Sequence, residues 1–248
     1  MQRYFLKNSQ FQNGKVSVTD DDAHHMKRVM RMKNGDTFIG CNENKECFYV
    51  EITEIETDFV QGKIIEQINQ TIEIPIEVTI AQGLPKGDKF EWVLQKGTEC
   101  GAANFIPVKM ERCVAKIDAK KESKKVERWT KIVKEAAEQS HRQSLPKVSS
   151  IMEFKNLLNM AKNYDACLFA YEEIAKTGEM SQLKKTINSL SPGSTLLILV
   201  GPEGGISENE EALLRESGFL PCALGPRILR TETAPIYILS AISYALEL

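Results

Sequence analysis

Two turns near the carboxyl end of the chain carry the residues whose types and spacing could do chemistry. The first has the sequence GPEGG and begins at Gly201, and the second has the sequence GPRILRTE and carries Arg227 and Arg230. Glycine lets a backbone approach a ligand closely, and a guanidinium can pair with a phosphate or with charge that develops on a carbonyl oxygen. The two turns are therefore a candidate ligand site with cationic side chains beside it.

The glycine turn does not match the common phosphate-binding loops. A Walker loop ends in Gly-Lys-Ser or Gly-Lys-Thr, and here Gly205 is followed by Ile206. A Rossmann fingerprint needs two glycines spaced two apart, and the turn contains no such pair. Glycines can also simply let a helix pack close to a strand, so GPEGG alone supports this structural explanation and a ligand site about equally.

Each turn follows a predicted strand. The apolar run at 196–200 is typical of a buried parallel strand, and a shorter strand is predicted at 222–224. Between them Ser207 and Glu210 form a capping box that begins a helix, and Gly218 ends it. Ligands of open α/β sheets bind at the carboxyl ends of strands, where both turns lie.

The rest of the chain divides into two patterns. Residues 1–70 read as short strands, at 36–41, 47–55 and 59–68, with a helical insert at 22–32, which is typical of a small β-barrel. A short polar boundary follows at 69–75. Strands and helices then alternate, which predicts a mainly parallel sheet covered by helices. We expect strands at 78–81, 104–108 and 165–171 and helices at 88–101, 124–139, 152–161, 180–190 and 235–246.

Composition limits the classes of function. The 248 residues are 42% hydrophobic and 27% charged with a net charge of -2, so any nucleic-acid site must be a local basic patch. The sequence has no apolar signal segment and no run of about 18 apolar residues, so we expect a cytoplasmic protein without a membrane span. Six cysteines without a C-x-x-C pair and three histidines predict reduced, mostly buried thiols and no metal site.

The two turns together resemble the RsmE family of ribosomal RNA methyltransferases, which belong to the SPOUT superfamily. Further blocks of the chain carry the resemblance: RYFL, HHMKRVMRMKNGD, GLPKGDKFEWVLQKGTECGA, PVKMERC, RWTKIVKEAAEQSHR and AYEE. The resemblance implies S-adenosylmethionine-dependent methylation of N3 of a uridine in 16S ribosomal RNA, within the small ribosomal subunit. It also implies an α/β fold in two domains, a PUA-like β-barrel at 1–70 that binds RNA and a SPOUT-type parallel sheet with a C-terminal trefoil knot at 74–248, and a homodimer with the terminal helix near the interface.

The resemblance also assigns roles to residues of the two turns. Main-chain groups of both turns are expected to hold the cofactor. These residues are Val200, Gly201, Pro202, Glu203, Gly204, Gly205, Leu224, Gly225, Pro226, Ile228, Leu229 and Arg230. For the chemical step, Arg230 and Arg227 are the expected cations and Glu232 the candidate base, ahead of Glu203 and Glu172. A single glutamate at such a position is more commonly a helix cap or half of an ion pair.

RNA contacts are expected from basic residues of both domains. In the small domain these are Arg3, His25, Arg28 and Arg31, and in the large one Lys86, Lys89, Lys96 and Arg142. The basic run at 120–134 is interleaved with acidic residues, which is more typical of a helix face exposed to water.

Two other functions stay open at this point. One is a non-enzymatic RNA-binding or ribosome-assembly protein that keeps the fold, and the other is a SPOUT enzyme that modifies a ribose or guanine in transfer RNA. The first would not need intact glycine turns, and both are intact. The chain departs from the commonest family pattern at Cys100, where leucine is usual, and at Pro235, and neither residue lies in the turns.

Overall fold

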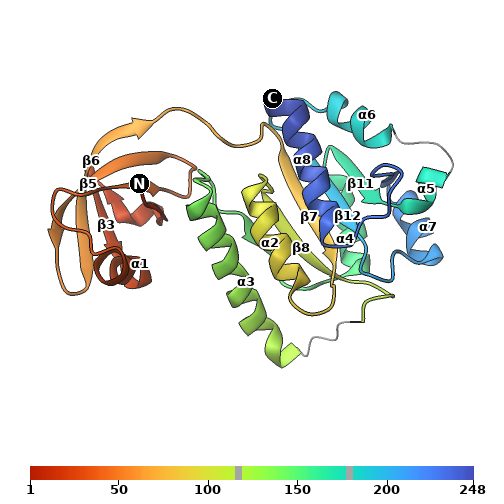
Figure 1. The fold of residues 1–248 in the computed structure, drawn as a ribbon, viewed down its shortest axis with the longest axis horizontal. Coiled ribbons are helices and arrows are strands. Elements are labelled where there is room, and N and C mark those ends of the chain that lie inside the picture. The colour runs from red at the N-terminus through yellow and green to blue at the C-terminus, as the bar shows by residue number, and fades with distance from the viewer. Residues whose placement is uncertain (115–118, 177–180) are drawn as a thin grey trace. The chain divides into compact units, whose positions relative to one another are not determined.

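The computed structural model describes residues 1–114, 119–176 and 181–248, and these form two compact units. The first unit comprises Met1–Glu73 and Ala137–Leu145, and the second comprises Ile74–Ala136 and Pro146–Leu248 (Figure 1). The domains expected from the sequence, 1–70 and 74–248, differ from these units at residues 137–145. This short segment follows the body of a long helix and belongs to the first unit because it packs there.

The first unit is a six-stranded sheet in the order β1-β4-β5-β6-β3-β2. All neighbours pair antiparallel except β1 and β4, which are parallel. The elements are β1 (Arg3–Phe5), η1 (Asn8–Gln10), β2 (Phe11–Gln12), β3 (Lys15–Thr19), α1 (Asp20–His24), η2 (His25–Val29), β4 (Thr37–Cys41), β5 (Cys47–Ile55) and β6 (Phe59–Ile68). The three long strands follow the sequence prediction to within one residue.

The core of this unit forms under the helical insert. Met26 on η2 is buried with Tyr4, Phe38, Val50 and other apolar side chains. The Tyr4 hydroxyl lies 3.0 Å from Nδ1 of His25. The insert was predicted at 22–32 and runs as α1 and η2 from Asp20 to Val29, so its type is confirmed and its limits shift by two or three residues.

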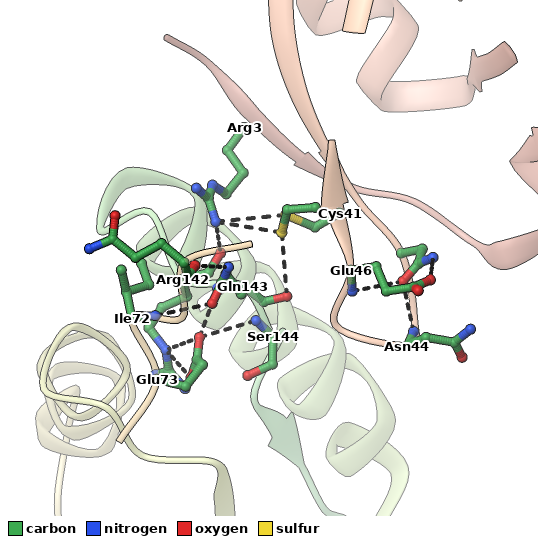
Figure 2. The surroundings of a disulfide bond; sticks show 12 residues. Arg3, Cys41, Asn44, Glu46, Ile72, Glu73, Arg142, Gln143 and Ser144 are labelled. Carbon is green, nitrogen blue, oxygen red and sulfur yellow. Dashed lines mark hydrogen bonds and ion pairs between the residues drawn. A yellow bond between two sulfur atoms is a disulfide. The ribbon is translucent and has the colours of Figure 1, made fainter. Parts of the chain in front are cut away.

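A disulfide closes the β4–β5 hairpin. Cys41 and Cys47 pair across the two strands with their Cα atoms 4.1 Å apart (Figure 2). The prediction that all six thiols are reduced is therefore wrong for this pair, because the register of the hairpin places the two side chains opposite each other, which spacing in the sequence alone did not reveal. Cys100, Cys113, Cys167 and Cys222 are free thiols.

Arg3 is buried beside this disulfide. One guanidinium nitrogen, Nη1, donates to the carbonyl of Arg142 at 2.6 Å and lies 3.7 Å from both sulfurs of the bridge (Figure 2). Burial lowers the pKa of Arg3, against the opposing effect of Glu73. The side chain is 5% exposed. Arg3 thus joins the N-terminal strand to the segment at 137–145.

Arg142 is also buried and holds the last residue of the same unit. Its Nη2 and Nε lie 2.5 and 2.9 Å from Oε2 of Glu73, and the backbone N–H of Gln143 donates to Oε1 at 2.7 Å. Burial alone would raise the pKa of Glu73, but Arg142 and the backbone donors outweigh it and lower that pKa. The resulting stability is present above the unfolded pKa and lost as the pH falls through the folded value. The side chains of Arg3 and Arg142 are buried and bonded within the unit. The structure therefore does not support the RNA contacts predicted for them.

The second unit contains a seven-stranded parallel sheet in the order β10-β8-β7-β12-β11-β13, with β9 paired to β8. Every pairing is parallel, which confirms the predicted parallel sheet. Its strands are β7 (Glu77–Gly83), β8 (Asn104–Lys109), β9 (Lys147–Val148), β10 (Met152–Glu153), β11 (Ala166–Ala170), β12 (Thr195–Val200) and β13 (Leu220–Cys222). The central strands β7 and β12 are almost wholly buried, and the apolar run of β12 predicts this.

Helices pack against this sheet. They are α2 (Lys89–Glu99), α3 (Ala119–Gln139, whose last residues lie in the first unit), α4 (Phe154–Met160), η3 (Ala161–Asn163), α5 (Glu172–Lys176), α6 (Gln182–Ser189), α7 (Glu208–Glu216) and α8 (Thr233–Glu247). Leu157 of α4 and Leu214 of α7 share one core cluster with Leu197 and Leu199 of β12. Helices α2 and α8 lie side by side, and Gly97 of α2 faces β8 (Figure 1).

Several expected limits shift in this unit. The short strand predicted at 222–224 lies at Leu220–Cys222, and the terminal helix begins at Thr233 rather than at Pro235. The helix expected at 124–139 begins at Ala119, and the first two residues of the helix expected at 152–161 form the strand β10 instead. The helix predicted at 180–190 is α6, and its first predicted residue, Met180, falls outside the described residues. Among the helices of the described ranges, none is long and apolar enough to cross a membrane.

Reducing the disulfide should loosen the first unit only. The bridge closes a loop of six residues, for which the chain-entropy model gives about 2 kcal/mol of stability. We expect a Cys41→Ser/Cys47→Ser variant to show faster amide hydrogen exchange in β4 and β5. Both tryptophans, Trp92 and Trp129, lie in the second unit, so the urea midpoint followed by tryptophan fluorescence should not change. Unchanged exchange in the hairpin would contradict this role of the bridge.

Candidate active site

The glycine turn 200–205 follows β12 and packs closely against two other segments. A Cβ atom added at Gly83, the last residue of β7, would lie 2.5 Å from Cδ of Pro202. A Cβ atom added at Gly204 would lie 2.9 Å from Cβ of Arg112. Glycine is therefore required at both positions by close approach of the backbone, and the turn has little freedom to move.

Arg112 and the start of α7 fix the far end of this turn. The guanidinium of Arg112 donates from Nη1 to the carbonyls of Gly204 at 3.1 Å and Ile206 at 3.2 Å. The capping box predicted for α7 is confirmed, because the Glu210 backbone donates to Ser207 Oγ and the Ser207 backbone to Glu210 Oε2.

Glu111 extends this cap to the segment after β8. Ser207 Oγ donates to Glu111 Oε2 at 2.6 Å, and the Glu111 backbone N–H donates to Glu210 Oε1 at 2.7 Å. Three elements, β8, β12 and α7, are thus joined around the glycine turn.

The second turn, 224–230, lies next to the first. Thr231 directly follows it, and its hydroxyl donates to the carbonyl of Gly201 at 2.6 Å. Thr231 Oγ1 also accepts a hydrogen bond from Gln82 Nε2 at 2.8 Å. Gly225 has a φ of +95°, a left-handed conformation that favours glycine. The structure therefore brings together the two turns that the sequence singled out.

Lys89 connects the candidate carboxylates at this edge of the sheet. Its ammonium lies 2.8 Å from Oε1 of Glu203 and 3.6 Å from Oε2 of Glu232. The hydrogen bond to Glu203 raises the pKa of Lys89. Partial burial would raise the pKa of Glu203, but Lys89 and the backbone N–H groups outweigh it and lower that pKa. Lys89 was predicted to contact RNA, and here it neutralises part of the acidic charge of the site.

Arg227 and Arg230 are exposed at the second turn. Within the described part of the chain, neither guanidinium forms a hydrogen bond or ion pair. The backbone of Arg230 is fixed, because its carbonyl accepts from the N–H groups of Thr233 and Ala234 at the start of α8. Two cationic side chains thus extend from an anchored backbone and are available to an anionic partner.

The other predicted RNA contacts have mixed surroundings. Lys86 is exposed, and its backbone N–H donates to Glu203. Lys96 forms an ion pair with Glu99 at 2.8 Å. In the first unit Arg28 and Arg31 are exposed, and His25 contacts Tyr4. These residues remain predicted contacts.

The sequence reasoning missed Gln82, Arg112 and Thr231 as individual residues. Gln82 is a long polar residue directly after the run Ile80-Ala81 of a buried strand, and a polar residue at such a position is a detectable signal. Arg112 and Thr231 lie within the sequence segments that carry the family resemblance, but nothing in a single sequence shows that their side chains bond to the glycine turn.

A cavity of about 610 Å³ lies elsewhere in the second unit. It is lined by residues at the amino ends of β11 and β13 and on α6, including Asp165, Thr186 and Leu220. In a parallel sheet this is the edge opposite the two turns. Among the described residues no cluster of histidine, cysteine or carboxylate side chains could hold a metal ion.

Comparison with known proteins identifies the family. Residues 72–243 match the family model of an RNA methyltransferase domain, and residues 18–65 match that of an RNA methyltransferase PUA domain. The chain is 49% identical over 251 residues to the ribosomal RNA small subunit methyltransferase E of Bacillus subtilis, covering 100% of this chain and 98% of that protein. This chain belongs to the ribosomal RNA small subunit methyltransferase E family.

Two solved structures of relatives contain the cofactor. The methyltransferase E of Neisseria gonorrhoeae, bound to S-adenosylmethionine, is 27% identical, with a TM-score of 0.83 over 99% of this chain and 98% of that one. A methyltransferase structure from Legionella pneumophila with the same cofactor is 30% identical, with a TM-score of 0.82 over 98% of this chain and 97% of that one. The predicted family, enzyme class and cofactor are confirmed.

Enlarging Gly83 should disturb the site through Pro202. In Gly83→Ala the new methyl group must displace Pro202, and forced packing of this kind costs about 1–3 kcal/mol. We expect calorimetric titration to show weaker binding of S-adenosylmethionine.

Gly218→Ala is the matched control for this variant. Gly218 has a φ of +88° with open space around its Cα, so alanine there strains the backbone away from the turns. It should lower the melting temperature and leave cofactor binding unchanged. Equal effects of the two variants on binding would count against the close contact.

Proposed function

We propose that this protein transfers a methyl group from S-adenosylmethionine to N3 of a uridine in 16S ribosomal RNA of the small subunit. The observation that carries the proposal is the joining of the two turns at the carboxyl edge of the sheet, with Arg227 and Arg230 exposed beside them. The name of the family supports a substrate in small-subunit ribosomal RNA.

The two turns fit the needs of this cofactor. S-adenosylmethionine supplies a sulfonium-bound methyl group that is already a strong electrophile. The protein must therefore bind it, align it with the nucleophile and exclude water. We assign binding to main-chain groups of residues 200–205 and 224–230, where glycines at 201, 204, 205 and 225 leave the backbone accessible.

The uracil ring must lose its N3 proton before or during transfer. A cation near a carbonyl oxygen of the ring stabilises the resulting anion, and a nearby base accepts the proton. We assign the cation role to Arg230, with Arg227 second, because both guanidinium groups lack partners within the described residues. Glu232 is the candidate base. It lies at the start of α8, with Lys89 3.6 Å away.

RNA binding requires cations that the protein does not use internally. Among the predicted contacts, exposed Arg28 and Arg31 of the first unit and Lys86 of the second meet this condition. The two arginines of the second turn, which are not among the predicted contacts, meet it as well. Contacts of this kind release counterions from phosphate groups, so binding should weaken as salt increases. The substrate would place the enzyme in the cytoplasm.

We further propose that the protein is a homodimer, that its C-terminal region forms a trefoil knot and that its first unit forms a closed β-barrel. Helix α8 buries Ile238, Leu239 and Ile242, whereas Tyr237 and Tyr244 on the same helix are 40% and 74% exposed. Exposed aromatic side chains of this size are typical of an interface. A monomeric mass by light scattering at micromolar concentration would argue against the dimer.

The activity is tested in two steps. Calorimetric titration measures binding of S-adenosylmethionine, and transfer of labelled methyl is then measured on small-subunit particles and on naked 16S RNA. We expect binding, and 3-methyluridine in the digested RNA by mass spectrometry. Cofactor binding with label in another nucleotide would disprove the N3 assignment, and absence of binding would favour a non-enzymatic RNA-binding protein.

Arg230→Ala should separate chemistry from cofactor binding. The main chain of Arg230 is anchored to α8, so removing its side chain should leave S-adenosylmethionine binding near the wild-type value. Loss of one donor to a developing oxyanion typically lowers kcat about 100- to 1000-fold. Single-turnover methylation measures this step, and Arg215→Ala, an exposed arginine paired with Glu211 on α7, is the control. Full turnover in Arg230→Ala would remove this residue from the chemical step.

A further inference from the structure

Gln82 is a buried polar residue at the end of a buried strand. Its side chain is 0% exposed, and it follows Ile80 and Ala81, which are also completely buried. Burying an amide costs free energy unless its polar atoms are hydrogen-bonded. The presence of glutamine here therefore needs a physical reason that a leucine or methionine could not supply.

The amide nitrogen of Gln82 supplies part of that reason. Nε2 lies 2.8 Å from Thr231 Oγ1 and 3.1, 3.3 and 3.4 Å from the carbonyl oxygens of Gly83, Gly201 and Val200. Since the Thr231 hydroxyl gives its own proton to Gly201, all four neighbours are acceptors. The nitrogen end of the amide must face them, and its two protons are shared among the four.

These acceptors come from three segments that are distant in the sequence. Val200 is paired with Gln82 in the last rung of the β7–β12 ladder. The ladder ends at this rung, and the Gln82 amide donates to the carbonyls of Val200 and Gly201 at its end. Its bond to Thr231 Oγ1 also links β7 to the residue that follows the second turn.

The amide oxygen is not satisfied in the same way. Gln82 Oε1 is buried, and no atom of the described residues donates a hydrogen bond to it. A buried acceptor without a partner typically costs about 1–3 kcal/mol. Glutamine at this position therefore donates to three carbonyl oxygens and leaves one buried acceptor of its own without a partner.

We propose that Gln82 and Thr231 are positioning residues that hold the two turns at the separation required to bind S-adenosylmethionine. The proposal rests on the cofactor site proposed above. Main-chain groups recognise a ligand well only if their positions are fixed before it arrives, because ordering them on binding would cost affinity. Gln82 holds the carbonyl of Gly201 from β7, and Thr231 holds it from the segment of the second turn. Neither side chain needs to touch the cofactor.

The decisive variants are compared with a control that lowers stability alone. Gln82→Met removes a donor from the buried carbonyls of Val200 and Gly201, so the melting temperature should fall, as it should in the control. The dissociation constant for S-adenosylmethionine should increase about tenfold, which corresponds to about 1.4 kcal/mol. Thr231→Val should weaken cofactor binding similarly, and Thr231→Ser, which keeps the hydroxyl, should restore it. The KM for RNA should not change in any of these variants.

Thr79→Val is the matched control. Thr79 is a completely buried threonine on the same strand, and its hydroxyl accepts from Asn104 and Tyr164 near the opposite end of the sheet. Its loss should lower stability without changing cofactor affinity. If Gln82→Met weakened cofactor binding no more than Thr79→Val does, or if both site variants bound the cofactor as wild type does, the positioning role would be refuted.

Hydrogen exchange tests the coupling without cofactor. The Gly205 N–H donates to Pro202 in the first turn at 2.9 Å. Exchange of peptides covering 200–205 should accelerate in Thr231→Val, although the substitution lies in the other segment, and should not accelerate in Thr79→Val. Unchanged exchange would overturn the coupling. If the wild-type protein bound no S-adenosylmethionine, the proposed function would fail while this exchange result still decided whether the two turns are held together.

Discussion

The pairing of β7 with β12 is the interaction on which the second unit depends. The two strands pair in parallel from Glu77 with Thr195 to Gln82 with Val200, and both are buried because helices cover the sheet. A ladder of this kind must end where the chain turns away, and the backbone groups beyond its last rung need other partners. Here a side-chain amide and a threonine hydroxyl supply them. Main-chain groups thus become available to a ligand where the regular pairing of the two strands ends.

Close packing gives the glycine turn its shape from several sides. Gly83 contacts it from β7, Arg112 from the segment after β8, and Thr231 from the segment before α8. The capping box of Ser207 and Glu210 then directs the chain into α7 and is itself bonded to Glu111. The site is therefore made by side chains of distant segments that hold one another's backbone, which agrees with recognition of the cofactor by main-chain atoms rather than by a dedicated acidic residue.

Local signals in the sequence predicted most of the elements and both turns, but not the contacts between them. Periodicity located β5, β6 and α2, and the spacing of Ser207 and Glu210 identified a helix start, because these features depend on neighbouring residues. The bridge between Cys41 and Cys47 depends on strand register, and the burial of Arg3 and Arg142 depends on the return of residues 137–145 to the first unit. A basic residue that the sequence presents as free to bind RNA can be bonded inside the folded protein. Only the three-dimensional structure distinguishes such a residue from one that is free.

This distinction explains how a chain with a net charge of -2 can serve a polyanionic substrate. Several of its cations are neutralised internally: Arg142 by Glu73, Lys96 by Glu99, Arg128 by Glu91, and Lys89 by Glu203 and Glu232. Arg227 and Arg230 have no such partner within the described residues and stand on the turn that Thr231 ties to the glycine loop. Long-range attraction by the whole protein would be weak, so affinity for RNA has to come from short-range contacts at such unpaired cations. In the proposed mechanism these two arginines link binding to chemistry, because the side chains left free for an anion lie on the turn that is proposed to hold the cofactor.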